Sequence, residues 1–289
     1  MPPHITRRRF LGYSALAAAG LAFYSGEIER HELWLTRQTV FLRDLPDSFR
    51  GFTIAQISDI HYDEFTEPFF VRHVVNRVNQ LKPDMVALTG DFVTDSPRSL
   101  EWGAAHASPC AEILSRLTAP LRYAVMGNHD AAVGPAKVTD ALVSHGIPVL
   151  ANSHVALDRK GDRIWIAGLN DATFMNPSVQ KAVPEEAMRR QQPVILLGHE
   201  PDYADTVAQQ LSDRRVDLML AGHTHGGQIR LHFFGNMFKP PLGKKYIRGL
   251  FQIGGLQLYV NRGIGTVNMP LRFRCPPEVT LFTLQRAIA

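Results

Sequence analysis

Five short polar segments of the chain carry residue types that bind metal ions. Each follows an apolar run, and together they hold five of the twelve histidines. The segments are Asp59-x-His61, Gly90-Asp91, Gly127-Asn128-His129-Asp130, Gly198-His199 and Gly222-His223-Thr224-His225. Carboxylate and amide oxygens, combined with neutral imidazole nitrogens, suit Mn, Fe, Zn or similar divalent ions rather than a thiolate-bound metal. The segments therefore predict a metal site with oxygen and nitrogen donors.

The number of donors exceeds what one ion needs. Asp130 is expected to be a turn or supporting acid, and the other Asp, Asn and His residues of the segments remain as donors. One carboxylate can bridge two ions, so two sites can share an Asp and leave positions for water and substrate. Two ions about 3.5 to 4 Å apart activate water at neutral pH and stabilise the attacking and leaving oxygens of an in-line displacement. Phosphoester hydrolysis is the reaction that fits this arrangement.

The elements that must position these segments alternate between strands and helices. Helical spacing connects Phe70, Val74, Val78 and Leu81. Buried strands are predicted at 52–57, 85–88, 123–126, 194–197 and 216–220, helices at 104–117 and 138–144, a hairpin at 149–157 and 163–167, and a β-rich end at 252–283. This order predicts an α/β layered fold. Because ligands bind at the carboxyl ends of strands in such sheets, the five segments should meet at one edge.

In order and spacing, the five segments resemble the motif set of the calcineurin-like metallophosphoesterases. The resemblance extends over the chain after about residue 50 and implies a four-layer α/β/β/α sandwich with a two-metal centre between its sheets. It implies that one ion is held by Asp59, His61 and His225, a second by Asn128, His199 and His223, and both by Asp91. The ions would be Mn, Fe or Zn, with their identity left open. His129 matches the family's non-ligand histidine, which protonates the leaving oxygen or stabilises phosphoryl charge.

One departure from the family pattern concerns the partner of His129. Many phosphoprotein phosphatases of this superfamily carry Gly-Asp-x-x-Asp, in which the second Asp orients that histidine. Here Thr94 stands where that motif has its second Asp, and the acid follows one residue later at Asp95. The partner of His129 is therefore left open, and protein phosphatase activity is disfavoured. Further acids near the segments are expected to support ligands rather than bind metal; they are Asp95, Asp130, Asp171 and Glu200.

The N-terminus has the features of an export signal. Thr6-Arg-Arg-Arg-Phe-Leu-Gly precedes an apolar stretch at 13–24, an arrangement that resembles a twin-arginine signal. We expect a signal or membrane anchor at 1–27, a metallophosphoesterase domain at 28–289, and export by the twin-arginine machinery to the periplasm or the outer face of the cytoplasmic membrane. The alternative is a cytoplasmic protein with a chance arginine run.

Charge and cysteine content exclude other classes of protein. The net charge is +4, and removing the three arginines of the first nine residues leaves +1, so a general nucleic-acid-binding surface is not expected. The two cysteines, Cys110 and Cys275, exclude a disulfide scaffold and a four-cysteine metal site. The oligomeric state is left open.

The stretch 231–251 bears on the substrate. It contains both apolar and cationic residues: Phe233, Phe234, Met237, Phe238, Lys239, Lys244, Lys245 and Arg248. Two interpretations remain, a surface for lipid-linked phosphates at a membrane and a packed flap with a solvated basic face. The first hypothesis of function is an exported phosphodiesterase or pyrophosphatase that uses attack by a metal-bound hydroxide. The alternatives are a UDP-2,3-diacylglucosamine pyrophosphatase-like lipid hydrolase and a non-catalytic scaffold, against which the complete ligand set argues.

Overall fold

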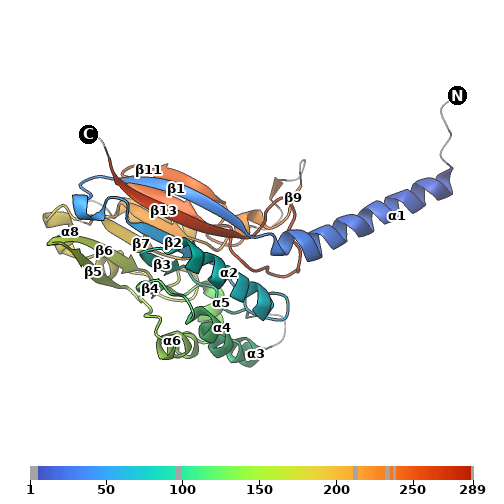
Figure 1. Ribbon diagram of the computed structural model, residues 1–289, viewed down its shortest axis with the longest axis horizontal. Coiled ribbons are helices and arrows are strands. Elements are labelled where there is room, and N and C mark those ends of the chain that lie inside the picture. The colour runs from blue at the N-terminus through green and yellow to red at the C-terminus, as the bar shows by residue number, and fades with distance from the viewer. Residues whose placement is uncertain (1–5, 96–98, 211–213, 232–234, 237–238, 288–289) are drawn as a thin grey trace.

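Two β-sheets form the centre of the molecule (Figure 1). The computed structural model describes residues 6–95, 99–210, 214–231, 235–236 and 239–287. The first sheet has the order β1 (Trp34–Leu42), β13 (Glu278–Arg286), β2 (Thr53–Ile57), β3 (Met85–Leu88) and β4 (Leu121–Ala124). The second has the order β11 (Gly249–Ile253), β12 (Leu256–Val260), β8 (Leu218–Ala221), β7 (Val194–Leu197), β6 (Asp162–Gly168) and β5 (Ser153–Arg159). A small antiparallel pair joins β9 (Arg230–Leu231) to β10 (Gly235–Asn236).

Helices cover the outer face of each sheet. The first sheet is covered by helices that follow its own strands: α2 (Pro68–Leu81), α3 (Leu100–Ala105), α4 (Ala107–Leu114), α5 (Asn128–Val133) and α6 (Pro135–Ser144). The second sheet is covered by α7 (Val179–Ala182), α8 (Glu185–Arg189) and α9 (Ala204–Gln209). Short 3-10 turns complete the chain: Glu29–His31, Asp47–Phe49, Pro201–Tyr203 and His225–Gly227.

Side-chain alternation along the strands builds three apolar layers. In β3, Val86 and Leu88 pack against the helices, whereas Met85 and Ala87 pack against the second sheet. Strands β7 and β8 divide their side chains in the same way between the inter-sheet core and the helices α7 to α9. Because both faces are buried, these strands appear in the sequence as continuous apolar runs. The expected four-layer α/β/β/α sandwich is confirmed.

The topology brings the polar segments to one edge. Strands β2, β3 and β4 run parallel in the first sheet, and β7 and β8 run parallel in the second. Each of these strands ends two to four residues before a predicted metal ligand. Residues from all five loops accordingly lie within shared clusters of donor atoms.

Several boundaries differ from the predictions. The helix expected at 104–117 is two helices, because Pro109 cannot donate a backbone hydrogen bond and its ring would clash with the carbonyl of Ala105. Strand β4 ends at Ala124 because it pairs with β3, whose last residue is Leu88. Strand β1 was not predicted. It pairs in parallel with β13, and its partly exposed, mixed polar sequence lacks a clear alternation.

Helix α1 (Arg7–Phe23) projects away from the sandwich (Figure 1). The Thr6 side chain caps it by accepting a hydrogen bond from the Arg9 backbone N–H. None of its residues is buried. A π-helical turn (Tyr24–Ile28) follows, in which Ser25 and Gly26 are buried against the domain. Among the described residues, no helix combines the length and apolar character needed to cross a bilayer.

Candidate metal centre

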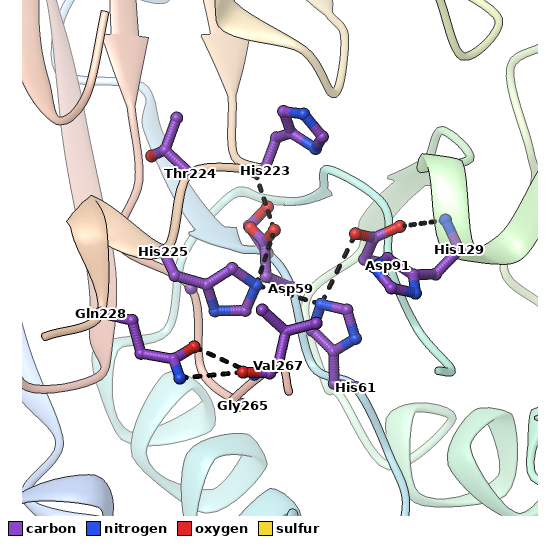
Figure 2. Close-up of polar contacts among 12 residues, drawn as sticks. Asp59, His61, Asp91, His129, His223, Thr224, His225, Gln228, Gly265 and Val267 are labelled. Atoms are coloured by element: carbon purple, nitrogen blue, oxygen red, sulfur yellow. Dashed lines mark hydrogen bonds and ion pairs between the residues drawn. The ribbon is translucent and has the colours of Figure 1, made fainter. Parts of the chain in front are cut away.

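The predicted donors gather in two connected clusters. Within each cluster the donor atoms lie within 4.8 Å of one another; the clusters are Asp59, His61 and His225, and Asp91, His199 and His223. A third combination, His61, Asp91 and His129, connects them. Figure 2 shows His61 and His225 converging on Asp59, with Asp91 beside His61. Six of the seven predicted ligands therefore share one buried site with His129.

The first cluster lacks a positive charge of its own. The Nε2 atoms of His61 and His225 face each other at 3.1 Å, and His225 Nε2 lies 3.5 Å from Asp59 Oδ1. Burial lowers the pKa of His61 to about 3 and holds that of His225 well below its usual range, so both rings are neutral. The other carboxylate oxygen, Asp59 Oδ2, is buried without a hydrogen-bond partner. Neutral imidazoles around an unsatisfied carboxylate fit a divalent cation.

Asp91 lies between the two clusters. Its Oδ2 atom is 3.5 Å from His61 Nε2 and 3.0 Å from His199 Nε2. Burial opposes its ionisation, but His199, His129 and His61 outweigh that effect and hold the pKa of Asp91 well below its usual range. His199 Nε2 lies close to Asp91 Oδ2, but the two atoms do not have the geometry of a hydrogen bond. Asp91 is therefore an ionised carboxylate in contact with histidines of both clusters, as a bridging ligand must be.

Outer hydrogen bonds orient the ring of His61. The Thr94 hydroxyl donates to Asp63 Oδ2 at 3.0 Å and lies 3.3 Å from His61 Nδ1. Because its proton is directed to Asp63, this hydroxyl accepts from Nδ1–H of His61. Nε2 of His61 is then left with its lone pair toward the cluster, a common arrangement behind metal-binding histidines.

Backbone carbonyls orient two further histidines in the same manner. His199 Nδ1 donates to the Thr89 carbonyl at 2.7 Å, which leaves Nε2 facing Asp91. His223 Nε2 donates to the Pro241 carbonyl at 2.6 Å, which leaves Nδ1 for the cluster. Burial lowers the pKa of His223 to about 4, so it is neutral. The cluster nitrogens of both rings are thereby defined by their outer partners.

Asn128, the seventh predicted ligand, begins α5. Its Oδ1 atom is buried without a hydrogen-bond partner, which is the state expected of a ligand oxygen. The loop before it is tied to the Asp91 loop by Asp130, which accepts from Gly127 N at 3.0 Å and Phe92 N at 2.8 Å. A Cβ atom at Gly127 would overlap Asp91 Oδ1, so this approach of the two loops requires glycine. Asp130 thus has the supporting role expected of it.

The backbone at the ligands is unusual. Left-handed φ angles occur at five of the seven predicted ligands: Asp59 (51°), His61 (46°), Asp91 (55°), His223 (72°) and His225 (49°). This region is sparsely populated by residues other than glycine, and such conformations cluster at functional sites. These five residues follow strands β2, β3 and β8, so the chain turns sharply where those strands end.

Asp95 is the partner of His129 that sequence reasoning left open. Its Oδ1 atom lies 2.6 Å from His129 Nδ1, and the backbone N–H of His129 donates to Asp91 Oδ1 at 2.9 Å. Burial opposes protonation of His129, but Asp91 and Asp95 outweigh it and raise the pKa of His129 to about 9. An acid that stands one residue after the expected position therefore still contacts His129. Only the three-dimensional path of the loop reveals this.

A cavity of about 260 Å³ opens beside His129. Its walls combine apolar and acidic side chains, including Phe65, Trp102, Met269, Asp63 and Asp95. Phe65 and Met269 are partly exposed, at 37% and 48%. The cavity is the space next to the cluster in which the departing part of a substrate could lie.

Other residues considered in the sequence have structural contacts. Asp171 Oδ2 accepts from Phe174 N at 2.6 Å, and Glu200 Oε2 accepts from Ala172 N at 3.1 Å, so both acids organise one loop. Cys110 and Cys275 are buried and free.

Two arginines beside the cluster have different surroundings. Arg262 Nε lies 3.7 Å from Glu278, which is an ion pair rather than a contact with the cluster. Arg272 was not predicted. It is fully buried, and its Nη2 lies 3.4 Å from His225 Nδ1.

The structure describes part of the stretch 231–251. Phe233, Phe234, Met237 and Phe238 lie outside the described residues. Lys244 is exposed, whereas Lys245 pairs with Asp205 at 2.7 Å.

Comparisons with known proteins identify relatives of this chain. The family model described as calcineurin-like phosphoesterase matches residues 52–227. The metallophosphoesterase YkuE of Bacillus subtilis (strain 168) is 36% identical, with 97% of this chain and 98% of that protein covered. Phosphodiesterase YaeI of Escherichia coli (strain K12) is 33% identical, with coverage of 97% and 99%.

A solved structure shares the fold. Haemophilus influenzae NAD nucleotidase (NadN) aligns with a TM-score of 0.51 and 18% identity, covering 73% of this chain and 45% of the nucleotidase. Motif order, sandwich architecture and sequence similarity therefore agree, and the chain belongs to the calcineurin-like phosphoesterase family.

Proposed function

We propose that this protein hydrolyses phosphodiester or pyrophosphate bonds with two divalent metal ions. The observation that carries the proposal is the position of Asp91, whose ionised carboxylate contacts histidines of both donor clusters. The name of the relative YaeI, a phosphodiesterase, agrees with phosphodiester substrates.

The donor set supports a two-ion assignment. Asp59, His61 and His225 would hold one ion, Asn128, His199 and His223 the other, and Asp91 both. When bound, such a pair of ions activates water and offsets charge on the attacking and leaving oxygens. Mn, Fe and Zn all remain compatible with oxygen and imidazole donors.

The chain's own acid is His129. Asp95 engages Nδ1, so Nε2 is the ring nitrogen available to a substrate in the cavity. From there it donates a proton to the departing oxygen or a hydrogen bond to the phosphoryl group. Asp95 acts through His129, as a positioning residue that fixes the orientation of the ring.

A lipid-linked pyrophosphate is a second candidate substrate. The cavity beside His129 has Phe65, Trp102 and Met269 in its walls, which suits an apolar portion of a substrate such as UDP-2,3-diacylglucosamine. The carboxylates of Asp63 and Asp95 in the wall of this cavity disfavour an anionic group of the substrate there. A non-catalytic scaffold is disfavoured because the full donor set and His129 are retained.

We further propose export by the twin-arginine route, to the periplasm or the outer face of the cytoplasmic membrane. The support is the Arg7-Arg8-Arg9-Phe10-Leu11 sequence at the start of an exposed apolar helix. Changing the arginine run to lysines should retain the protein in the cytoplasm on cell fractionation. Unchanged export would contradict this route.

A substrate panel tests the proposed activity. Purified protein stripped with a chelator should hydrolyse an aryl phosphodiester or a lipid pyrophosphate only after Mn, Fe or Zn is returned. His223→Asn should abolish this hydrolysis, whereas His73→Asn, at an exposed histidine on α2, should not. Hydrolysis that survives both chelation and His223→Asn would overturn the two-ion proposal.

A further inference from the structure

A second cavity has four arginines in its wall and none of the predicted metal ligands. Its volume is about 560 Å³, and we refer to it as the arginine pocket. It is lined by Arg230, Arg248, Arg262 and Arg274, together with Tyr24, Glu29, Glu32, Trp34, Phe273 and Pro276. None of the predicted metal ligands or His129 contributes to its wall, so the metal centre does not explain it.

The acids in the wall are directed to other partners. Glu29 Oε1 accepts from Cys275 N at 2.7 Å, and Glu32 Oε1 accepts from Trp34 Nε1 at 3.2 Å. Within the described part of the chain, no carboxylate lies within 4.0 Å of Arg248 or Arg274. Burial lowers the pKa of Arg248, and the neighbouring Arg230 and Arg262 lower it further. Arg262 pairs with Glu278, so the arginines left to favour an anion are Arg248 and Arg274, whose guanidinium groups match phosphate oxygens.

The pocket adjoins the base of α1. Tyr24 follows the last residue of this helix, and Trp34 begins β1. Large apolar side chains of α1 are distributed around the helix rather than along one stripe, and Leu16 is 72% exposed. A helix that is apolar on all sides is normally buried in a core or a membrane. A partner helix would instead favour a single apolar stripe.

The same end of the molecule carries other exposed apolar groups. His31 packs its ring 5.3 Å from that of Phe69, and Arg30 Nη2 pairs with Glu67 Oε1 at 2.8 Å. Trp34 and Phe69 are about half exposed. Arg30 also donates to the carbonyl of Phe65, whose side chain lines the cavity beside His129. The base of α1 is therefore physically connected to the rim of the metal centre.

We propose that the arginine pocket binds the phosphate of an anionic phospholipid in a bilayer that α1 enters. Charge complementarity selects the phospholipid: cationic side chains lie where an apolar helix leaves the domain, and Trp34 provides an aromatic group suited to the membrane interface. Docking in this way places the cavity beside His129 near the lipid surface. This inference concerns a binding surface and does not depend on the proposed hydrolysis.

Vesicle flotation of the full chain tests the proposal without metals or substrate. The wild-type chain should bind phosphatidylcholine vesicles containing phosphatidylglycerol more tightly than vesicles of phosphatidylcholine alone. The double variant Arg248→Gln/Arg274→Gln should lose about 30-fold in affinity for the anionic vesicles, because each arginine near such a surface contributes about fivefold. Leu16→Asp should weaken binding to both kinds of vesicle.

The matched control is Arg159→Gln/Arg189→Gln, which removes two exposed arginines from β5 and α8, at the end of the molecule opposite α1 (Figure 1). It should bind anionic vesicles like the wild type. Circular dichroism and the melting temperature show whether each variant is folded. Equal loss in both double variants, or no loss in the folded Arg248→Gln/Arg274→Gln variant, would overturn the pocket's role.

Two further outcomes test the identity of the occupant. If inorganic phosphate raises the melting temperature through Arg248 and Arg274 while vesicles do not bind, the ligand is a free anion and the lipid assignment is wrong. If light scattering shows a dimer that Leu16→Asp dissociates, α1 is covered by a second copy of the chain, which also contradicts the proposal.

Discussion

The metal centre and α1 both depart from the usual distribution of side chains: the first buries polar groups, and the second exposes apolar groups. At the metal centre, carboxylates and histidines are buried, and hydrogen bonds that the rings donate to oxygens of Thr94, Thr89 and Pro241 orient the rings. At α1, large apolar side chains are exposed and have no core to pack against. Buried polar groups and exposed apolar groups are the informative exceptions in a folded protein. The comparison teaches that the buried polar groups of the first region suit a cation, whereas the exposed apolar groups of the second suit an apolar environment.

The largest expected effect concerns the residue between the two donor clusters. Asp91→Asn removes the charge that both clusters share, and hydrolysis of an aryl phosphodiester should fall by about 10³-fold or more, beyond the loss of a single electrostatic contact. Metal content per chain, measured by mass spectrometry, should fall as well. Asp140→Asn, at an exposed acid on α6, is the control. Wild-type activity in Asp91→Asn would show that the buried carboxylate serves only the fold.

A smaller effect is expected at the outer edge of the centre. Asp95→Asn should lower kcat about 10- to 100-fold with little change in KM, which is less than the 10²- to 10⁴-fold that the acid itself contributes, because His129 remains. The loss should be greater for an alkyl leaving group than for p-nitrophenolate, because a poor leaving group needs the proton from His129. His129→Asn sets the upper limit, and Asp95→Glu should recover part of the rate. Equal losses for both leaving groups would argue against proton donation.

The hydroxyl behind His61 should affect metal affinity rather than folding. Thr94→Val removes the hydrogen bond at Nδ1, and affinity for Mn or Zn should fall about 10- to 100-fold. Thr94→Ser keeps the hydroxyl and should bind metal like the wild type. Titration calorimetry of the metal-free chain measures the affinity, and its melting temperature reports folding. If valine and serine behave alike, the hydroxyl does not orient the ring.

The smallest effect is expected in α1. Leu16→Ser should change the free energy of unfolding in water by less than about 0.5 kcal/mol, because that side chain packs against no core. Leu197→Ala, between the two sheets, should cost about 2–5 kcal/mol. Chemical denaturation measures both values. A large cost for Leu16→Ser would mean that α1 packs against the domain, and the contrast with the metal centre would disappear.

The sequence predicted the fold and the gathering of donors because parallel strands share one edge. Four-residue apolar runs such as β3 and β7 ended near their predicted positions, and the polar residues after them had to meet. Strand β1 escaped prediction because it pairs with β13 at the far end of the chain, a contact that local pattern does not report.

The contact between Asp95 and His129 escaped prediction for a related reason. It depends on how two loops pass each other, including the left-handed turn at Asp91, and not on the spacing of one motif. The burial of Arg272 beside His225 is likewise a tertiary property, since an arginine near the C-terminal end of a sequence is ordinarily exposed.

The central assignment is that Asp91 joins two cations within one buried site. Anomalous X-ray scattering from crystals grown with Mn measures this directly. Two peaks about 3.5 to 4 Å apart, both in contact with Asp91, are expected. A single peak, or two peaks of which only one contacts Asp91, would contradict the assignment.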